Sequence, residues 1–143
     1  MTISPTIRFH FLAKISLKDR QILKTALINL FRKEKRELAE LHYIFVSDAR
    51  LLEINREFLK HDFYTDILTF PFSKSNQPIF GEIYISVDRV KENAREFSGS
   101  IRNELLRVIF HGALHLCGYK DKTRKDQAIM RKREEVYLRS YLN

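Results

Sequence analysis

The sequence contains little cysteine, glycine and proline, and it has no tryptophan. Among 143 residues there are one Cys, four Gly and three Pro. A single cysteine excludes an intramolecular disulfide framework, and so few Gly and Pro residues argue against a linker or a low-complexity segment. No apolar run approaches the ~20 residues that a membrane-spanning helix needs, and the N-terminus lacks the pattern of a secretion signal. We therefore expect a single domain over residues 1–143, a cytoplasmic location and no membrane partner.

Basic residues outnumber acidic ones. The chain has 26 Lys and Arg against 18 Asp and Glu, which gives a formal net charge of +8. A surplus of this size in a small domain favours a polyanionic partner such as RNA or DNA. A basic protein without such a partner is the alternative that charge alone leaves open.

Hydrophobic periodicity and turn residues predict four strands and about five helices. The short connection between the third and fourth strands predicts a hairpin. The order of the elements indicates an α+β fold, in which a small mixed four-stranded sheet is packed with helices. The strands are expected at residues 6–12, 40–48, 66–72 and 79–85, and the helices after Ser16, at about 48–59, after Ser86, and at about 101–117 and 123–142.

Two details of these helices are specific enough to be checked. Ser16 is a good N-cap residue, with Asp19 three positions later, and it is expected to begin the first helix. Phe97 is expected to share the apolar face of the third helix with Val87 and Val90.

The stretch HGALHLCGYKD contains a candidate metal site. His111 and His115 are four residues apart on a predicted helix, so their imidazoles lie on one face, one turn apart. Gly118 is placed to end that helix, and Asp121 follows three residues later, where its carboxylate can act as a third ligand. Three protein ligands leave a fourth position open, as at a catalytic zinc site of the zincin type. The sequence therefore predicts one divalent transition metal ion, zinc, although nickel or another ion also suits such ligands.

Two neighbouring positions limit the chemistry of this site. The zinc peptidase motif H-E-x-x-H has its general base next to the first histidine, and that position is Gly112 here. A peptidase of this type is therefore disfavoured. Cys117 is interpreted as a small core residue and not as a ligand.

With these residues, the sequence resembles the YbeY family of endoribonucleases. HGALHLCGYKD resembles the family signature H-G-x-L-H-L-x-G-Y-D-H. A second block, from Asn55 to Phe72, resembles L-N-x-x-Y-R-x-K-D-x-P-T-D-V-L-S-F-P-F, and GEIYIS at residues 81–86 resembles a third family motif. The resemblance implies a zinc protein that cleaves single-stranded RNA and acts in maturation of the 3′ end of 16S ribosomal RNA and in ribosome quality control.

The sequence departs from the family pattern at four positions. Asp121 stands where the family has its third metal-binding histidine, and Lys120 replaces the Asp before it. Tyr64 replaces a Pro, and Leu59 replaces an Arg that the family is thought to use for RNA handling or catalysis. Lys60 or His61 is a candidate to supply the missing positive charge near a phosphodiester.

Residues with a candidate role in substrate binding come from two regions. The first is the polar cluster before the third strand, for which capping and turn formation are the alternative. The second is the basic stretch after the metal motif, which suits phosphate contacts but is also compatible with a solvated helix face. The candidates are Asn55, Lys60, His61, Asp62, Thr65, Asp66, Lys122, Arg124 and Lys125.

We thus predict a metal-dependent endoribonuclease that acts on single-stranded ribosomal RNA and whose partner is the ribosome. No residue is assigned as general base, and attack by the RNA's own 2′-hydroxyl is as compatible with the pattern as attack by water. The alternatives are a non-catalytic ribosome-assembly factor with a structural metal and a metallohydrolase of another substrate class.

Overall fold

The computed structural model describes residues 4–143. Its four strands and five α-helices confirm the predicted α+β fold, and the helical segment after α3 continues as a π-helical turn. The strands are β1 (Thr6–Phe11), β2 (Leu38–Val46), β3 (Ile67–Pro71) and β4 (Ile79–Ser86). The helices are α1 (Arg20–Lys33), α2 (Asp48–Leu59), α3 (Val87–Asn93), the π-helical turn Ala94–Ser98, α4 (Ile101–Leu116) and α5 (Arg124–Leu142).

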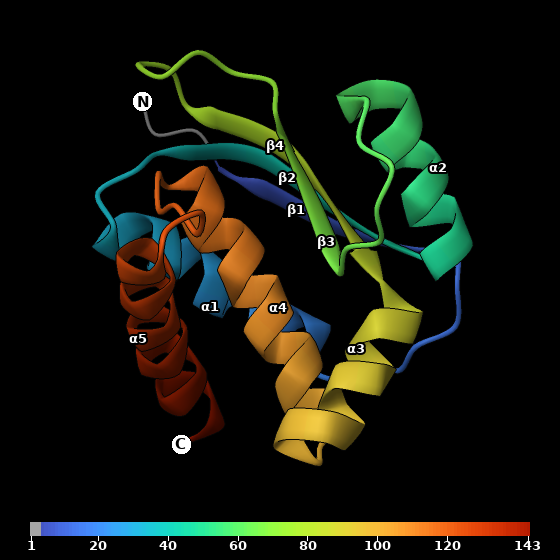
Figure 1. Ribbon diagram of the computed structural model, residues 1–143. Coiled ribbons are helices and arrows are strands. Elements are labelled where there is room, and N and C mark those ends of the chain that lie inside the picture. The colour runs from blue at the N-terminus through green and yellow to red at the C-terminus, as the bar shows by residue number, and fades with distance from the viewer. Residues whose placement is uncertain (1–3) are drawn as a thin grey trace.

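The four strands form one mixed sheet in the order β1-β2-β4-β3 (Figure 1). Strands β1, β2 and β4 are parallel, and the chain returns through a helix between β1 and β2. Strand β3 runs antiparallel to β4, with Ile67 opposite Ile85, so the predicted hairpin is confirmed. The sheet therefore ends in β3, whose Ile67 lies against Gly112 of α4.

The two faces of the sheet are covered unequally. Helices α1, α4 and α5 pack on one face and form the main core, to which β2 contributes the fully buried Tyr43 and Phe45. Helix α2 packs on the other face over a smaller cluster that includes Ile44 and Val46. The alternation along β2 divides its side chains between these cores, as strand geometry requires.

Helix α4 lies very close to the sheet. A Cβ atom added at Gly112 would lie 2.9 Å from two side-chain atoms of Ile83 and 3.0 Å from Ile67. At Gly81 on β4, an added Cβ would lie 3.0 Å from Leu116 of the same helix. The absence of side chains at these two positions lets the helix and the sheet approach each other, and this contact fixes where the histidines of α4 stand.

Two predictions about the helices were wrong, one about where the first helix begins and one about the buried face of the third. The first helix begins later than expected, because its N-cap is Asp19 and not Ser16; Asp19 has a left-handed backbone (φ 56°) and makes no capping hydrogen bond with its side chain. Phe97 does not share the buried face of α3, since 79% of it is exposed. The π-helical turn from Ala94 to Ser98 rotates the chain out of the α-helical repeat, which explains this exposure.

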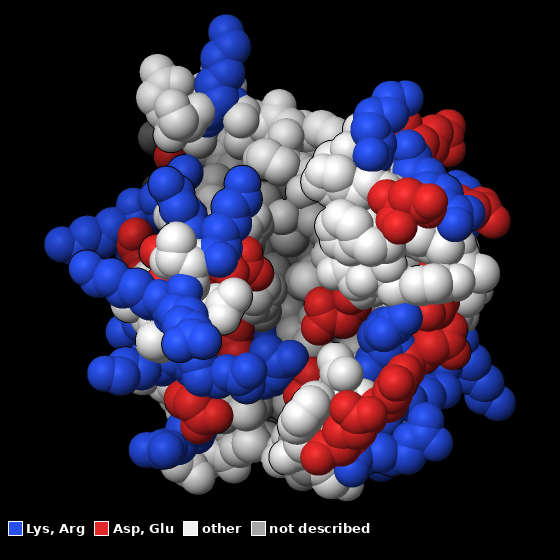
Figure 2. Space-filling model, viewed as in Figure 1, with Lys and Arg blue, Asp and Glu red and all other residues white. Residues whose placement is uncertain are grey.

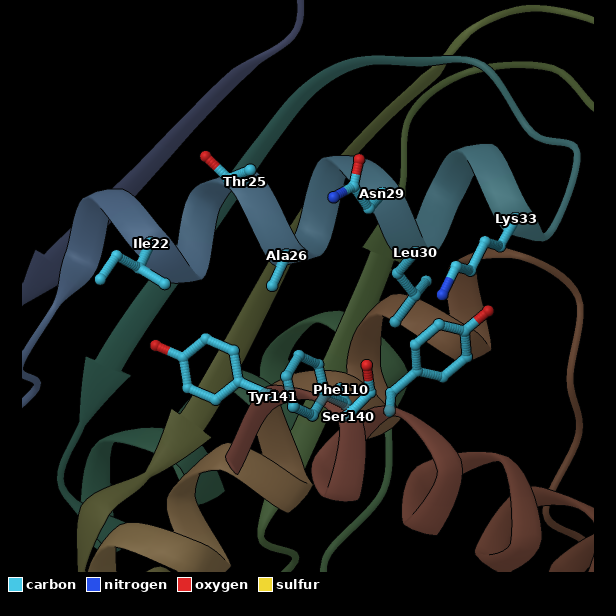
Figure 3. A pocket seen from close by; sticks show the side chains of 10 residues that line it. Ile22, Thr25, Ala26, Asn29, Leu30, Lys33, Phe110, Ser140 and Tyr141 are labelled. Carbon is cyan, nitrogen blue, oxygen red and sulfur yellow. The ribbon is translucent and has the colours of Figure 1, made fainter. Parts of the chain in front are cut away.

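A hollow of about 380 Å³ lies on the helical side of the molecule, between α1 and the end of α5 (Figure 3). Ile22 and Ala26 of α1 face Phe110 and Tyr141 across it. None of the predicted site residues lines this hollow. Among residues 4–143, no helix is long and apolar enough to span a membrane.

Candidate metal centre

Helix α4 carries the two histidines of the motif on one side, as the spacing predicts. Their rings are nearly parallel, with an interplanar angle of 4° and 6.4 Å between the ring centroids. His111 is mostly buried, with 15% of its side chain exposed, whereas His115 in the last turn is exposed. One imidazole is therefore held by the protein interior and the other is open to solvent.

The turn after α4 depends on Gly118, as predicted. Its φ angle is 113°, a conformation that residues with a side chain rarely adopt. The amide of Gly118 donates to the carbonyl of His115 at 3.0 Å, and the amide of Tyr119 donates to that of Leu114 at 3.2 Å. This pair of hydrogen bonds is the Schellman motif, which reverses the chain and brings residue 121 back toward the histidines.

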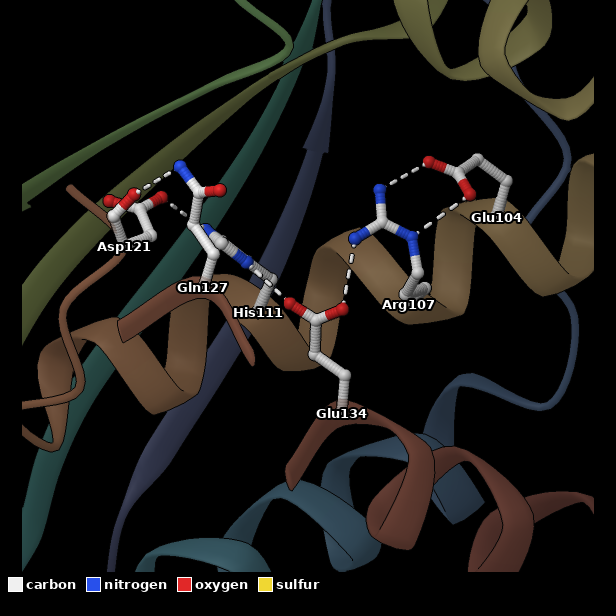
Figure 4. A network of polar contacts seen from close by, with 6 residues as sticks. All are labelled: Glu104, Arg107, His111, Asp121, Gln127 and Glu134. Atoms are coloured by element: carbon white, nitrogen blue, oxygen red, sulfur yellow. Dashed lines mark hydrogen bonds and ion pairs between the residues drawn. The ribbon is translucent and has the colours of Figure 1, made fainter. Parts of the chain in front are cut away.

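Asp121 meets His111 in space. Its Oδ2 atom lies 3.3 Å from Nε2 of His111, and its side chain is 43% exposed. The side-chain amide of Gln127, on the first turns of α5, donates to the backbone carbonyl of Asp121 at 3.0 Å (Figure 4). Helix α5 thus helps to place the third predicted ligand.

The other ring nitrogen of His111 is held by a buried carboxylate. Nδ1 of His111 lies 2.6 Å from Oε2 of Glu134, a residue of α5 whose side chain is only 3% exposed. Burial lowers the pKa of His111, but the hydrogen bond and the charge of Glu134 outweigh it and raise the pKa above its usual range. In contrast, partial burial, together with the charge of His111, lowers the pKa of His115 in spite of the nearby Asp121.

Asp66 joins this site from the second sequence block. It precedes β3 and is mostly shielded from solvent, and burial raises its pKa. The positive charges of Arg107 and His111 act in the opposite direction, so both groups lie within electrostatic reach of this carboxylate. The charges of Asp66 and His111 therefore influence each other, although no hydrogen bond joins these two side chains among the contacts of the described residues.

The remaining candidates of that cluster make local contacts. Asn55 is fully buried, and its side-chain amide donates to the carbonyl of Phe63 at 2.9 Å, so its role here is to brace the loop. Asp62 forms an ion pair with Arg56, and the Thr65 hydroxyl donates to the carbonyl of Ile67 at 3.4 Å. For these residues the structure supports the capping and turn roles.

Lys60 and His61 lie just after α2. Lys60 is the C-cap residue of that helix and has a left-handed backbone with φ 58°. His61 stacks on Phe63, with 5.2 Å between ring centroids. Leu59, which stands in place of the family Arg, ends α2 and is 37% exposed.

The three basic candidates after the metal motif are exposed around the start of α5. Lys122 precedes the helix, and Arg124 and Lys125 begin its first turn. Between them, Thr123 caps the helix because its hydroxyl oxygen accepts a hydrogen bond from the amide of Asp126. Figure 2 shows Lys and Arg side chains gathered on the α5 side of the molecule, beside a hollow that separates it from the α2 side. These side chains are accessible to a large ligand.

Position 112 cannot carry the general base of a peptidase in this structure. Gly112 faces Ile83 and Ile67 of the sheet, and there is no space even for a Cβ atom without displacement of these side chains. A glutamate at this position would therefore point into the core. Cys117 packs against the main core, as predicted, and burial raises its pKa to about 12.

Sequence reasoning missed the buried charges behind His111. Arg107 bridges two carboxylates, with 3.0 Å from Nη1 to Oε1 of Glu134 and 2.5 Å from Nη2 to Oε2 of Glu104 (Figure 4). The spacing of Glu104, Arg107 and His111 by three and four residues places them on one side of α4, a signal that was available. No local signal pointed to Glu134, because it is brought to His111 by the packing of α5.

His111, His115 and Asp121 are residue types that bind zinc, although the structure does not bring the three side chains into a coordinating arrangement. Among the described residues, no group of three or more His, Cys, Asp and Glu side chains is arranged so that it could hold a metal ion as it stands. However, His111 and Asp121 already face each other, and the nitrogen of His111 that faces Asp121 is not the one used by Glu134. Two imidazoles and a carboxylate are ordinary ligands of Zn²⁺.

Comparison with known proteins gives one consistent family. Residues 11–142 match a family model described as Endoribonuclease YbeY. A curated protein of Cytophaga hutchinsonii with that name is 49% identical over 122 residues, which cover 85% of each chain, and one of Flavobacterium johnsoniae is 41% identical over 129 residues, which cover 90% of this chain and 92% of the relative. A solution structure of a Thermotoga maritima protein superposes with a TM-score of 0.65 at 31% identity, covering 95% of this chain and 88% of that one.

Proposed function

Because the chain belongs to the YbeY family of endoribonucleases, we propose that it cleaves single-stranded RNA with the help of one divalent transition metal ion, zinc. Its proposed substrate is ribosomal RNA, with a role in maturation of the 3′ end of 16S ribosomal RNA and in ribosome quality control in the cytoplasm. The observation that carries the proposal is the geometry of His111, whose Nε2 faces Asp121 at 3.3 Å while Nδ1 is held by Glu134.

In this proposal, His111, His115 and Asp121 hold the ion. A divalent ion there would supply positive charge beside a phosphodiester and would acidify a water molecule. His111 is held from behind by a buried carboxylate, whereas Asp121 lies in the loop between α4 and α5. Both helices therefore contribute to the site: α4 carries the two histidines, and α5 holds His111 through Glu134 and Asp121 through Gln127.

The protein's own basic residues would hold the RNA backbone. Lys122, Arg124 and Lys125 are exposed at the start of α5, directly after the loop that carries Asp121. Phosphate contacts from such side chains provide affinity without sequence preference. Asp66, from the second sequence block, lies within reach of the charge of His111, and we include it in the site in this proposal.

Cleavage of a single-stranded RNA by zinc-loaded protein tests the proposal. His115→Ala should lose at least about 100-fold in activity, since even the hydrogen-bond partner of a metal ligand is commonly worth 10–100-fold. His115 is exposed, so the variant should fold. The matched control is His10→Ala, an exposed histidine on β1 that is hydrogen-bonded to His42, and it should retain activity. Equal cleavage by the wild type and His115→Ala would overturn the proposal.

Elemental analysis tests the ligand set independently of activity. The wild type should carry one zinc ion per chain, and His111→Ala and Asp121→Ala should each carry less after dialysis against a weak chelator. An Asp121→Ala variant that retains a full complement of zinc would remove Asp121 from the ligand set. Zinc binding and RNA binding without cleavage would instead identify a ribosome-assembly factor with a structural metal.

A further inference from the structure

A chain of four charged or polar side chains runs behind the proposed metal site (Figure 4). Glu104, Arg107 and His111 lie along one side of α4, and Glu134 joins them from α5. Arg107 donates to Glu104 on one side and to Glu134 on the other, and the second oxygen of Glu134 lies 2.6 Å from Nδ1 of His111. This series of hydrogen-bonded side chains therefore ends at the imidazole of His111, which we propose as a metal ligand.

This network is buried, so each of its charged groups needs a hydrogen-bonding partner within the protein. The side chains of Glu104, Arg107 and Glu134 are 4%, 18% and 3% exposed. Buried carboxylates are strongly unfavourable unless they are paired and hydrogen-bonded. A buried ion-pair network is often no more stabilising than apolar residues of the same volume, so stability alone does not account for its placement against His111.

Both ring nitrogens of His111 face a carboxylate, Nδ1 that of Glu134 at 2.6 Å and Nε2 that of Asp121 at 3.3 Å. A neutral ring has a single proton, and the shorter, buried contact to ionised Glu134, which can only accept, favours its place on Nδ1. The lone pair is then on Nε2, the nitrogen that faces Asp121. Histidine ligands of metals are commonly oriented by such a hydrogen bond from the nitrogen that does not bind the ion.

We propose that Glu134 is a positioning residue that fixes the orientation and the tautomer of His111, and that Arg107, anchored by Glu104, fixes Glu134 in turn. This inference rests on the metal site in Proposed function and goes beyond it, because it assigns a role to three residues that bind neither metal nor substrate. It also explains why Arg107 is placed between two carboxylates of different helices.

Replacement of Glu134 by glutamine gives a sharp test, because glutamine has one acceptor and one donor group. Arg107 is only a donor, so it will retain the carbonyl oxygen of the new side-chain amide. The amide nitrogen must then face His111, where it donates to Nδ1 and forces the proton onto Nε2. A change from Asp to Asn beside a catalytic histidine is harmful for the same reason.

Nuclear magnetic resonance of ¹⁵N-labelled histidine reads this tautomer directly in metal-free protein at alkaline pH, where the rings are neutral. The wild type should have its proton on Nδ1 of His111, and Glu134→Gln should move it to Nε2. Zinc affinity, measured by competition with a chelator, should fall by about 10–100-fold in the variant. The control Glu135→Gln alters an exposed carboxylate of the same helix and should change neither reading.

A second substitution should reverse the effect. In Glu134→Gln combined with Arg107→Met, no guanidinium holds the carbonyl of the introduced amide, so this side chain can turn and accept from Nδ1 of His111. The tautomer should return to that of the wild type, and zinc affinity should recover at least in part. A purely structural role of Glu134 predicts the opposite, because the double variant loses more buried interactions than the single one.

The outcomes separate this proposal from the metal site itself. A proton on Nε2 of His111 in the wild type would overturn the positioning role even if no variant folded. An unchanged tautomer and unchanged zinc affinity in folded Glu134→Gln would do so as well. A tautomer change in a protein whose wild type binds no zinc would support the positioning role and count against the metal-dependent function.

Discussion

At the scale of single residues, the site depends on backbone positions as much as on ligands. Gly118 holds a φ angle of 113° and closes the Schellman motif that follows His115. A Cβ atom at this position would have space, since the nearest atom outside the local chain, on Arg36, is 3.8 Å away. The requirement for glycine is therefore conformational and not one of packing.

Gly118→Ala should lower the free energy of unfolding by about 1–3 kcal/mol, the usual range for a residue forced into such a conformation. Zinc affinity should also fall, because the turn places Asp121. Denaturant unfolding and chelator competition measure the two effects. Gly99→Ala is the matched control: Gly99 also has a positive φ angle of 72° but ends the π-helical turn before α4, so this variant should lose stability without loss of zinc affinity. Equal zinc affinity in both variants would contradict this role of Gly118.

At the scale of elements, Glu34 joins three parts of the chain. It follows α1 and accepts hydrogen bonds from Tyr119 in the loop after α4 at 2.7 Å, from Arg133 of α5 at 2.6 Å, and from Tyr137 of α5. Burial raises the pKa of Glu34, but these three hydrogen bonds outweigh it, so the pKa lies below its usual range. The carboxylate thus holds α1, α5 and the loop that carries Asp121, the proposed third ligand, together.

Glu34→Gln should destabilise the protein by about 1.5–3 kcal/mol at neutral pH, the usual contribution of hydrogen bonds to a charged group. A carboxylate with a lowered pKa in the folded state stabilises above its unfolded pKa, and this contribution is lost as the pH falls through the folded pKa. The difference between the variant and the wild type should therefore be largest at neutral pH and vanish in acid. Thermal unfolding across pH measures it, with exposed Glu57→Gln as the control. A difference that is independent of pH would contradict the assignment.

The elements themselves were largely predictable from the sequence, because period-two and helical patterns depend on local burial. The caps Ser47, Ser86 and Thr123 form as their residue types indicate. The N-cap at Ser16 failed, since its neighbours Leu17 and Ile15 pack on the core while the chain remains outside the helix up to Asp19. The π-helical turn after α3 has no sequence signal that periodicity could detect.

The candidate site, too, was predictable where it depends on local sequence and not where it depends on tertiary packing. Helix spacing and a glycine predicted His111, His115 and the turn, since these are properties of one short segment. Glu134 contacts His111 only because α5 packs on α4, and the charge of Asp66 acts on His111 only because the fold places the start of β3 near α4. Contacts between residues distant in sequence require the tertiary structure, and no local pattern could reveal them.

At the scale of the whole molecule, positive charge gathers on the α5 side, next to the hollow in Figure 2. The arrangement places basic side chains beside the proposed metal site while the carboxylates near it are buried or held in pairs. A polyanion that approaches this face would meet positive charge before it reaches the proposed metal ligands.

Neutralisation of single basic residues tests this charge distribution. Lys122→Gln, Arg124→Gln and Lys125→Gln should each weaken binding of single-stranded RNA and reduce the slope of log affinity against log salt by about 0.7, the value for one phosphate contact on a single strand. Lys18→Gln, on the exposed loop before α1, is the control of equal charge and should leave the slope unchanged. Filter binding or fluorescence anisotropy across a salt series measures both. Identical slopes in all four variants would exclude these residues from the RNA-binding surface.

The close approach of α4 to the sheet at Gly112 has a consequence for how this protein can change in evolution. The histidine-bearing helix rests on Ile83 and Ile67 with no side chain of its own between them. A larger or differently branched residue at either strand position would shift the helix, and with it His111 and His115, because the contact leaves no free space. The core and the proposed metal site are therefore coupled in evolution: hydrophobic substitutions at these two positions of β3 and β4 move the helix that carries the histidines, although neither isoleucine is part of the site.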